Sequence, residues 1–235
     1  MPGAPPILEV RGVSKSFGAL RALTACDLTV QRGEIVGLIG PNGSGKTTLF
    51  NILAGSLAAD AGQVLFCGEN ISGWPAYRVA RKGIGRTFQI TRVFPQMTLL
   101  ENLRLAAGSR HGTDKARELL SLVGLLKFEH EYAADLSFGQ QRLLSLIQVL
   151  TLDPALVLLD EPAAGVNPNM QNTMLDLIHR LNGDGKTFLI VEHNMDVVMN
   201  HCGRVVVLNL GEKIAEGAPQ DVRRDEAVLA AYFGS

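Results

Sequence analysis

The chain has 235 residues, of which 46% are hydrophobic and 19% are charged, which indicates a globular protein with a sizeable core and room for one large domain. Its net charge of -1 argues against a general surface for nucleic acids or anionic membranes. Residues 1–6 lack the charged and apolar regions of a signal peptide, and no run approaches the roughly 18 apolar residues of a membrane span. We therefore expect any membrane role to pass through a partner.

The cysteines lie far apart and show no metal-ligand spacing. Their odd number and their spacing argue against a disulfide framework and favour a reducing cytoplasm. We expect all three to be small, buried, apolar side chains: Cys26, Cys67 and Cys202.

Two antiparallel strands are expected at the N-terminus. Residues 7–14 alternate between apolar and polar side chains, and residues 27–30 form a second strand after a turn at 17–20. The ring of Phe17 in that turn either fills the space beneath it or offers a face on which a nucleobase stacks.

The next stretch has the pattern of a phosphate-binding loop: Gly, four residues, Gly, Lys and Thr. A buried strand over 34–39 precedes it, and a helix over 48–55 follows it. The glycines let backbone N–H groups approach phosphate oxygens, Lys46 reaches the β- and γ-phosphates, and the Thr47 hydroxyl reaches Mg²⁺. The candidate nucleotide-binding residues are Gly40, Pro41, Asn42, Gly43, Ser44, Gly45, Lys46, Thr47 and Thr48.

The middle of the chain changes from strands to helices. We expect strands over 62–68 and 83–89, with a short helix between them at 74–81. The helical pattern that follows predicts helices over 99–107, 115–123 and 140–150. Because strands resume afterwards, we interpret 98–150 as a helical subdomain inserted in an α/β core of residues 1–97 and 151–235.

Two further strands end in side chains that suit phosphate chemistry. The apolar run 155–162 ends in Asp160 and Glu161, and the run 187–192 is followed at once by His193. The carboxyl ends of parallel strands meet at one edge of a sheet, so these side chains are expected beside the phosphate loop. There Asp160 would hold Mg²⁺, Glu161 would orient and polarise the attacking water, and His193 would contact the γ-phosphate. The other histidines are expected to lie outside the site: His111, His130, His179 and His201.

The remaining elements are expected to complete the fold. Asn167 as an N-cap, with Pro168 at the first helical position, opens a helix that runs to about residue 182. A hairpin over 204–216 and an amphipathic helix over 225–233 close the chain.

The order of these motifs resembles the ATP-binding subunit of ABC transporters over essentially the whole chain. The discriminating piece is Leu-Ser-Phe-Gly-Gln-Gln-Arg at 136–142, which is similar to the signature of that family and is lacking in other phosphate-loop ATPases. The resemblance implies that Ser137, Gly139 and Gln140 bind the γ-phosphate of ATP held by a second subunit. It also implies that Phe17 stacks on adenine and that Gln89 belongs to the metal and water site. The fold class is then the phosphate-loop ABC ATPase core: a mostly parallel sheet with helices on both faces, an N-terminal antiparallel β subdomain and the helical insertion.

Narrower features resemble the first of the two ATPases of branched-chain amino acid importers. They are Arg-Thr-Phe-Gln at 86–89, the runs 93–98 and 101–103, the run 161–168, Glu-His-Asn-Met at 192–195 and the tail 217–234. The chain departs from the wider superfamily at Asn167, where Asp is frequent, at 147–149, where Ala-Arg-Ala is more usual, and around 109–113, where it is shorter. We expect the segment 89–101 to contact the permease through Val93, Phe94, Pro95 and Met97, the alternative being that these residues pack between the subdomains.

The resemblance implies ATP and Mg²⁺ as ligands and ATP hydrolysis that powers amino acid import. The implied partners are a second ABC ATPase subunit, membrane permease subunits and, indirectly, an extracytoplasmic solute-binding protein, with the chain on the inner face of the cell membrane; no nucleic acid is expected. Importers of urea or short amides share most motifs and are the first alternative. A non-transport ABC protein usually has two cassettes or basic extensions. A degenerate nucleotide sensor would lack one of Lys46, Asp160, Glu161 or His193, and all four are present.

Overall fold

The computed structural model describes residues 5–87, 93–108 and 112–233. The strands are β1 (Leu8–Phe17), β2 (Leu20–Val30), β3 (Ile35–Ile39), β4 (Ala61–Phe66), β5 (Glu69–Asn70), β6 (Ile84–Arg86), β7 (Leu156–Asp160), β8 (Thr187–Val191), β9 (Arg204–Asn209) and β10 (Glu212–Gly217). The α-helices are α1 (Lys46–Leu53), α2 (Ala76–Lys82), α3 (Leu99–Ala107), α4 (Gly112–Leu122), α5 (Phe138–Leu150), α6 (Pro168–Gly183), α7 (Met195–His201), α8 (Pro219–Val222) and α9 (Glu226–Phe233). Short 3₁₀ turns lie at Leu126–Phe128 and Ala133–Asp135.

A six-stranded sheet forms the centre, in the order β10-β9-β3-β8-β7-β6. All neighbouring strands from β9 to β6 run parallel, and β10 is antiparallel at one edge. Every residue of β3, β7 and β8 is buried, which is the pattern of parallel strands covered on both faces. The carboxyl ends of β3, β7 and β8 therefore lie side by side and bring the loops that follow them together.

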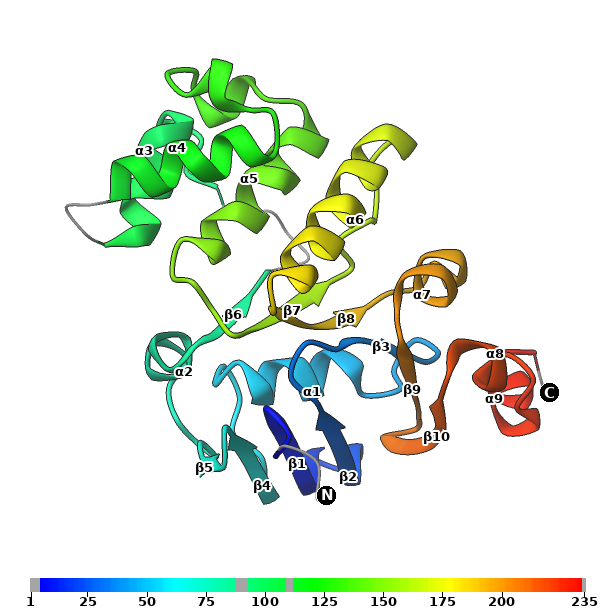
Figure 1. Ribbon diagram of the computed structural model, residues 1–235. Coiled ribbons are helices and arrows are strands. Elements are labelled where there is room, and N and C mark those ends of the chain that lie inside the picture. The colour runs from blue at the N-terminus through cyan, green and yellow to red at the C-terminus, as the bar shows by residue number, and fades with distance from the viewer. Residues whose placement is uncertain (1–4, 88–92, 109–111, 234–235) are drawn as a thin grey trace.

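Helix α1 and the antiparallel sheet β2-β1-β4-β5 cover one face of the central sheet (Figure 1). Val36 and Leu38 of β3 belong to the same buried cluster as Phe50 and Leu53 of α1. The helix that follows the phosphate loop is thus held between two sheets, and its N-terminus is fixed in position.

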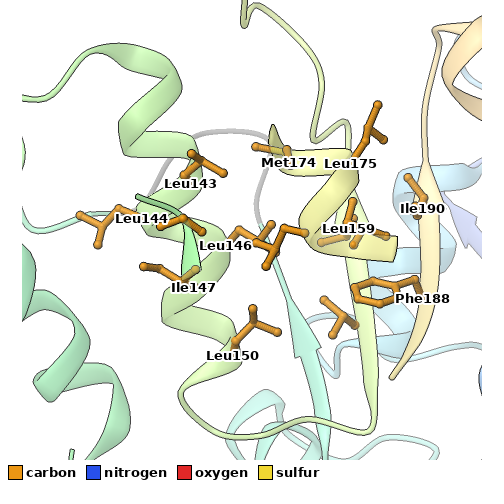
Figure 2. Packing of buried hydrophobic residues seen from close by; sticks show 14 of the residues in the cluster. Leu143, Leu144, Leu146, Ile147, Leu150, Leu159, Met174, Leu175, Phe188 and Ile190 are labelled. Atoms are coloured by element: carbon orange, nitrogen blue, oxygen red, sulfur yellow. The ribbon is translucent and has the colours of Figure 1, made fainter. Parts of the chain in front are cut away.

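Helices α5, α6 and α7 cover the other face. Figure 2 shows leucines of α5 packed against Met174 and Leu175 of α6, with Leu159 of β7 and Phe188 of β8 beneath them. Helices α3, α4 and α5 pack on one another and lie apart from the nucleotide-loop end of the sheet (Figure 1). Contacts between α5 and α6 join this helical layer to the core.

Some local boundaries differ from the sequence-based expectation. Strands β1 and β2 extend to a tight hairpin in which Phe17 pairs with Leu20, so the turn is shorter than expected. Register shifts in this pair, with Ala25 at a φ of 43°, break the alternation on which the strand prediction relied. Helix α5 begins at Phe138 rather than residue 140, because the side chain of Ser137 caps it. Helices α7 and α8 were not expected, because they are too short to show a period in the sequence.

The cysteine expectation holds for two of the three residues. Cys26 and Cys202 are buried, and Cys67 is exposed. Cys67 occupies the turn between β4 and β5, with a φ of 50°, where its side chain points to solvent rather than to a core. The expectation for Cys67 was wrong because an exposed turn cannot bury a side chain.

Candidate functional site

The phosphate loop follows β3 and leads directly into α1. Gly45 is the N-cap of α1 and has a φ of 103°, and a Cβ at this position would lie 2.5 Å from the carbonyl oxygen of Ala22. A Cβ on Gly40 would lie 2.0 Å from the carbonyl oxygen of Leu208. Both positions therefore require glycine, because the loop is pressed against the neighbouring strands β2 and β9.

The side chain of Lys46 is buried and closes the loop on itself. Its Nζ donates to the carbonyl oxygens of Gly40 and Pro41, each at 2.8 Å, and to Oγ of Ser44 at 3.2 Å. Burial lowers the pKa of the Lys46 ammonium, and the carboxylates of Glu161 and Asp160 oppose that shift. The loop thus holds a cation over its centre, where phosphate oxygens can replace carbonyl oxygens as acceptors.

A cleft of about 360 Å³ opens over the loop. Its walls include most of the loop, the aromatic ring of Phe17, and the side chains that follow β7 and β8. The lining residues are Phe17, Leu20, Arg21, Ala22, Asn42, Gly43, Ser44, Gly45, Lys46, Thr47, Thr48, Glu161, Val191 and His193. Phe17 is half exposed, and Nζ of Lys15 lies 5.7 Å from the centre of its ring. An open ring face at one end and a cation-bearing loop at the other suit a nucleotide.

The carboxyl ends of β7 and β8 bring an acid and a histidine together. Nε2 of His193 lies 2.9 Å from Oε1 of Glu161. Glu161 has a φ of 49°, an uncommon conformation for a residue other than glycine, and its N–H donates to the carbonyl oxygen of Val191 at 2.9 Å. This bond ties the turn after β7 to β8, so the backbone itself holds Glu161 toward His193.

Asp160, the last residue of β7, is buried and directly precedes Glu161. Its Oδ2 lies 3.1 Å from Nη2 of Arg86, and Nη1 of Arg86 donates to Asn51 of α1 at 2.7 Å. The backbone N–H of Asp160 donates to the hydroxyl of Thr87 at 3.2 Å. Arg86 thus compensates the buried carboxylate and links it to the helix of the phosphate loop.

The signature residues lie in the helical layer and do not line the cleft. The Ser137 hydroxyl accepts the N–H of Gln140, and the Gln140 side chain accepts the N–H of Ser137, a reciprocal cap at the N-terminus of α5. A Cβ on Gly139 would lie 2.7 Å from Cγ of Met170, so glycine lets α5 approach α6 closely. These residues form the N-terminus of α5, which lies away from the chain's own phosphate loop.

The structure brings some of the expected site residues together in the cleft and places others outside it. Phe17, most of the phosphate loop, Glu161 and His193 share the cleft, whereas Gln89 lies outside the described residues. Four further residues line the cleft because a hairpin and a strand end meet there, and no sequence motif marks them: Leu20, Arg21, Ala22 and Val191. Among the described residues, no cluster of three or more His, Cys, Asp or Glu side chains could hold a metal.

The remaining histidines lie away from the cleft where they are described. Nε2 of His179 lies 2.8 Å from Nδ1 of His201, and these two rings join α6 to α7 at a distance from the phosphate loop. His130 is exposed beside Glu129. His111 is outside the described ranges.

The sequence pattern of the ABC transporter family matches residues 23–164. The chain belongs to this family. It is an ABC ATPase, and the match spans the phosphate loop, the signature and the two acids at the end of β7, as the motif order predicted. A second pattern, that of the branched-chain amino acid ATP-binding cassette transporter, matches residues 212–235.

Known proteins resemble this ABC ATPase over nearly its full length. It is 38% identical to the high-affinity branched-chain amino acid transport ATP-binding protein BraF of Pseudomonas aeruginosa, over 97% of this chain and 98% of that protein. The ADP conformation of MJ1267, an ATP-binding cassette of an ABC transporter, superposes with a TM-score of 0.90 at 32% identity, covering 99% of this chain and all of the other. These similarities confirm the expected fold class.

A third similarity is to a dimer. The post-hydrolysis dimeric structure of the cassette MJ0796, bound to ADP and Pi, gives a TM-score of 0.81 at 27% identity, over 90% of this chain and 98% of that one. Across the described residues of this ABC ATPase, no helix is both long and apolar enough to cross a membrane.

Proposed function

We propose that this ABC ATPase binds MgATP in the cleft above its phosphate loop and hydrolyses it to power the import of branched-chain amino acids. The proposal of hydrolysis rests on one observation: Lys46, Glu161 and His193 line the same cleft. A cation, an acid and a histidine around a phosphate-sized space are the parts that phosphoryl transfer to water needs.

The nucleotide is held at both ends of the cleft. The exposed face of Phe17 receives the adenine by stacking, a contact worth roughly 1–3 kcal/mol for a base on an aromatic ring. The backbone N–H groups at the start of α1 receive the phosphates. When ATP binds, the Lys46 ammonium donates to phosphate oxygens instead of the carbonyl oxygens of Gly40 and Pro41. Its positive charge then lies beside the negative charge of the γ-phosphate.

The residues around the loop fit Mg²⁺. Thr47 lines the cleft, and Asp160 ends β7, which is separated from β3 by β8 alone, and the hydroxyl and the carboxylate are oxygen ligands of the kind that Mg²⁺ prefers. Mg²⁺ held by these residues would neutralise charge on the phosphates. We assign Gln89 to the same site on resemblance alone.

Glu161 acts as the base for the attacking water. Its carboxylate accepts a proton from water as the water approaches the γ-phosphate, and His193 orients this carboxylate through the contact at 2.9 Å. When phosphate occupies the cleft, the other ring nitrogen or a rotated His193 ring can contact the γ-phosphate. The fixed backbone of Glu161 keeps its carboxylate facing the cleft throughout.

A second subunit completes the site. Ser137, Gly139 and Gln140 stand at the start of α5, away from the chain's own loop, so they bind the γ-phosphate held by the partner. The similarity to a cassette whose structure is a dimer supports this arrangement. We infer that two such subunits pair head to tail on permease subunits at the inner face of the cell membrane.

The solute is assigned by similarity, since no residue of an ATPase subunit in the cytoplasm meets it. The match of residues 212–235 to the branched-chain amino acid cassette pattern and the 38% identity to BraF favour leucine, isoleucine or valine. These solutes reach the permease from an extracytoplasmic binding protein. The division into a core of 1–97 and 151–235 and a helical part of 98–150 serves this function by separating the phosphate loop from the signature.

Reconstitution tests the proposal. The ATPases are incorporated in vesicles with their membrane subunits and the binding protein, and uptake of labelled leucine is measured together with phosphate release. We expect leucine uptake that needs both ATP and the binding protein. ATP-driven uptake of urea or a short amide, with none of leucine, would refute the solute and leave the ATPase assignment intact. Absence of phosphate release from the complete assembly would refute the hydrolysis.

A further inference from the structure

A buried acid that the proposed mechanism does not use lies directly before His193. Glu192 is 3% exposed, and its carboxylate faces inward at the end of β8. Charged groups at such depth are rare unless hydrogen bonds compensate them. The four residues before it, Phe188 to Val191, are all apolar and buried, so a carboxylate at this position needs an explanation.

The Glu192 carboxylate joins two catalytic loops. Its Oε1 accepts the backbone N–H of Ala163 at 2.9 Å, and Ala163 lies two residues after Glu161. Its Oε2 accepts the backbone N–H groups of His193 at 3.2 Å and Asn194 at 3.4 Å. One side chain therefore holds the backbone on both sides of the contact between Glu161 and His193.

The surroundings of this carboxylate compensate its burial. Burial raises the pKa of Glu192, whereas the three backbone N–H groups act in the opposite direction. The guanidinium of Arg142, from the helical layer, is close enough to interact electrostatically with Glu161, Asp160 and Glu192. Both oxygens of the Glu192 carboxylate thus accept hydrogen bonds. A side chain with only one acceptor oxygen would leave at least one of these backbone N–H groups without an acceptor.

We propose that Glu192 is a positioning residue for hydrolysis, which sets the distance between Glu161 and His193 by clamping the backbone of both loops. The inference rests on the proposed function, because it assigns Glu192 a part in the same reaction without contact to the nucleotide. It binds Ala163, His193 and Asn194 only through their backbones, so its effect passes through the Glu161–His193 contact.

The test replaces Glu192 with glutamine. The amide keeps the shape but offers one acceptor and one donor group, so either Ala163 or the pair His193 and Asn194 faces a donor instead of an acceptor. We expect kcat for ATP hydrolysis to fall roughly tenfold and KM for ATP to change less than about twofold, because the phosphate loop is untouched. The matched control is Asp196→Asn, an exposed acid in α7 close to the same loop, which should leave both constants unchanged.

A double-mutant cycle separates positioning from general support of the fold. In the His193→Ala background the contact is already lost, so Glu192→Gln should reduce single-turnover hydrolysis less than about twofold further. Equal losses in both backgrounds, or a rise in KM with kcat unchanged, would overturn the proposal.

A second readout needs no hydrolysis. In nucleotide-free protein with ¹⁵N-labelled histidine, Glu192→Gln should move the Nε2 resonance of His193 toward its position in Glu161→Ala protein, where the acceptor is absent. An unmoved resonance would overturn the positioning role.

If Glu192→Gln gives no cooperative melting transition, both measurements are made on Glu192→Asp, which keeps the charge and shortens the side chain. Loss of hydrolysis in the wild-type protein would refute the proposed function, and this resonance would still decide the placement of Glu192.

Discussion

Nε2 of His193 lies 2.9 Å from Oε1 of Glu161, although the two residues are separated by a helix, a strand and their loops. The pair forms because β7 and β8 are parallel neighbours with Asp160 opposite Val191, so the residues after each strand meet at one edge. The bond from Glu161 N–H to the Val191 carbonyl then fixes the turn. The geometry of the base is therefore set by strand register rather than by loop sequence.

Glu161→Gln should retain ATP binding and lose hydrolysis by two orders of magnitude or more, on the order of the contribution of a positioned base. The amide keeps the shape and the contact with His193 but cannot accept a proton from water. Phosphate release and nucleotide binding are measured on the same preparation, with Glu118→Gln, an exposed acid of α4, as the control. Hydrolysis near the wild-type rate in Glu161→Gln would remove this residue from its role.

A mixture of Ser137→Arg chains with Lys46→Ala chains should trap one ATP between two subunits, which neither chain does when it pairs with itself. Ser137 and Lys46 lie in different layers, so a mixed dimer has one site with both residues intact and one with neither. Trapped ATP per dimer is measured with light scattering to verify the dimer. Loss of the Ser137 cap costs roughly 1 kcal/mol, so melting curves must show that the variant is folded. No gain on mixing, with folded dimers present, would contradict a shared site.

Much of the cleft could be predicted because its residues belong to short, continuous sequence patterns. The phosphate loop is a continuous motif between a buried strand and a helix, and the acids and the histidine each follow an apolar strand at once. The spacing in sequence fixes which strand end carries each side chain. The parallel sheet then brings these ends together without any further information.

The rest depends on contacts between distant segments. Arg86 pairs with Asp160 across 74 positions, and the carboxylate of Glu192 reaches Ala163 across 29. No local pattern marks such partners, because an arginine after a strand or an acid before a histidine fits many surroundings. The bulges of β1 and β2 were also hidden, since a register shift changes which face a residue occupies while leaving its identity the same.

Cys67 alone should react quickly with a thiol reagent in the native protein at pH 8. Cys67 is exposed, whereas burial raises the pKa of Cys26 to about 11 and that of Cys202 to about 12. Reagent absorbance should report one thiol per chain before denaturation and three after it, and Cys67→Ser should remove the fast one. Two fast thiols in the native chain would show that a buried cysteine is accessible.

The same two thiols predict how stability depends on pH. A folded pKa above the ordinary value of 9.0 means that the native state favours the neutral thiol. The contribution is complete below about pH 9 and is lost as the pH rises toward 11 and 12. Urea unfolding at pH 8 and pH 10 should therefore show lower stability at pH 10, and Cys202→Ala should reduce the difference. A pH dependence identical in Cys202→Ala would assign the effect to other groups.

Phe94 presents its side chain outward on a turn that the core holds firmly. Asn102 is fully buried, accepts the N–H of Phe94 at 2.8 Å and donates to its carbonyl oxygen at 3.0 Å. Gln148 of α5 donates to the same Asn102 oxygen at 3.1 Å. The backbone of this turn is thus fixed to the helical layer while the Phe94 ring remains 49% exposed, which argues against the alternative that it packs between the subdomains.

Phe94→Asp should spare the ATPase activity of the free subunit and uncouple it from transport. If the ring enters an interface with the permease, the substitution removes apolar burial and places an unpaired charge there, together about 2–4 kcal/mol. Leucine uptake and phosphate release are measured in the reconstituted assembly. Leu229→Asp, an equally drastic change at a half-exposed leucine of α9, serves as the control. Uptake unaffected by Phe94→Asp would end the coupling role of this turn, whereas equal loss in both variants would point to a general effect of surface charge.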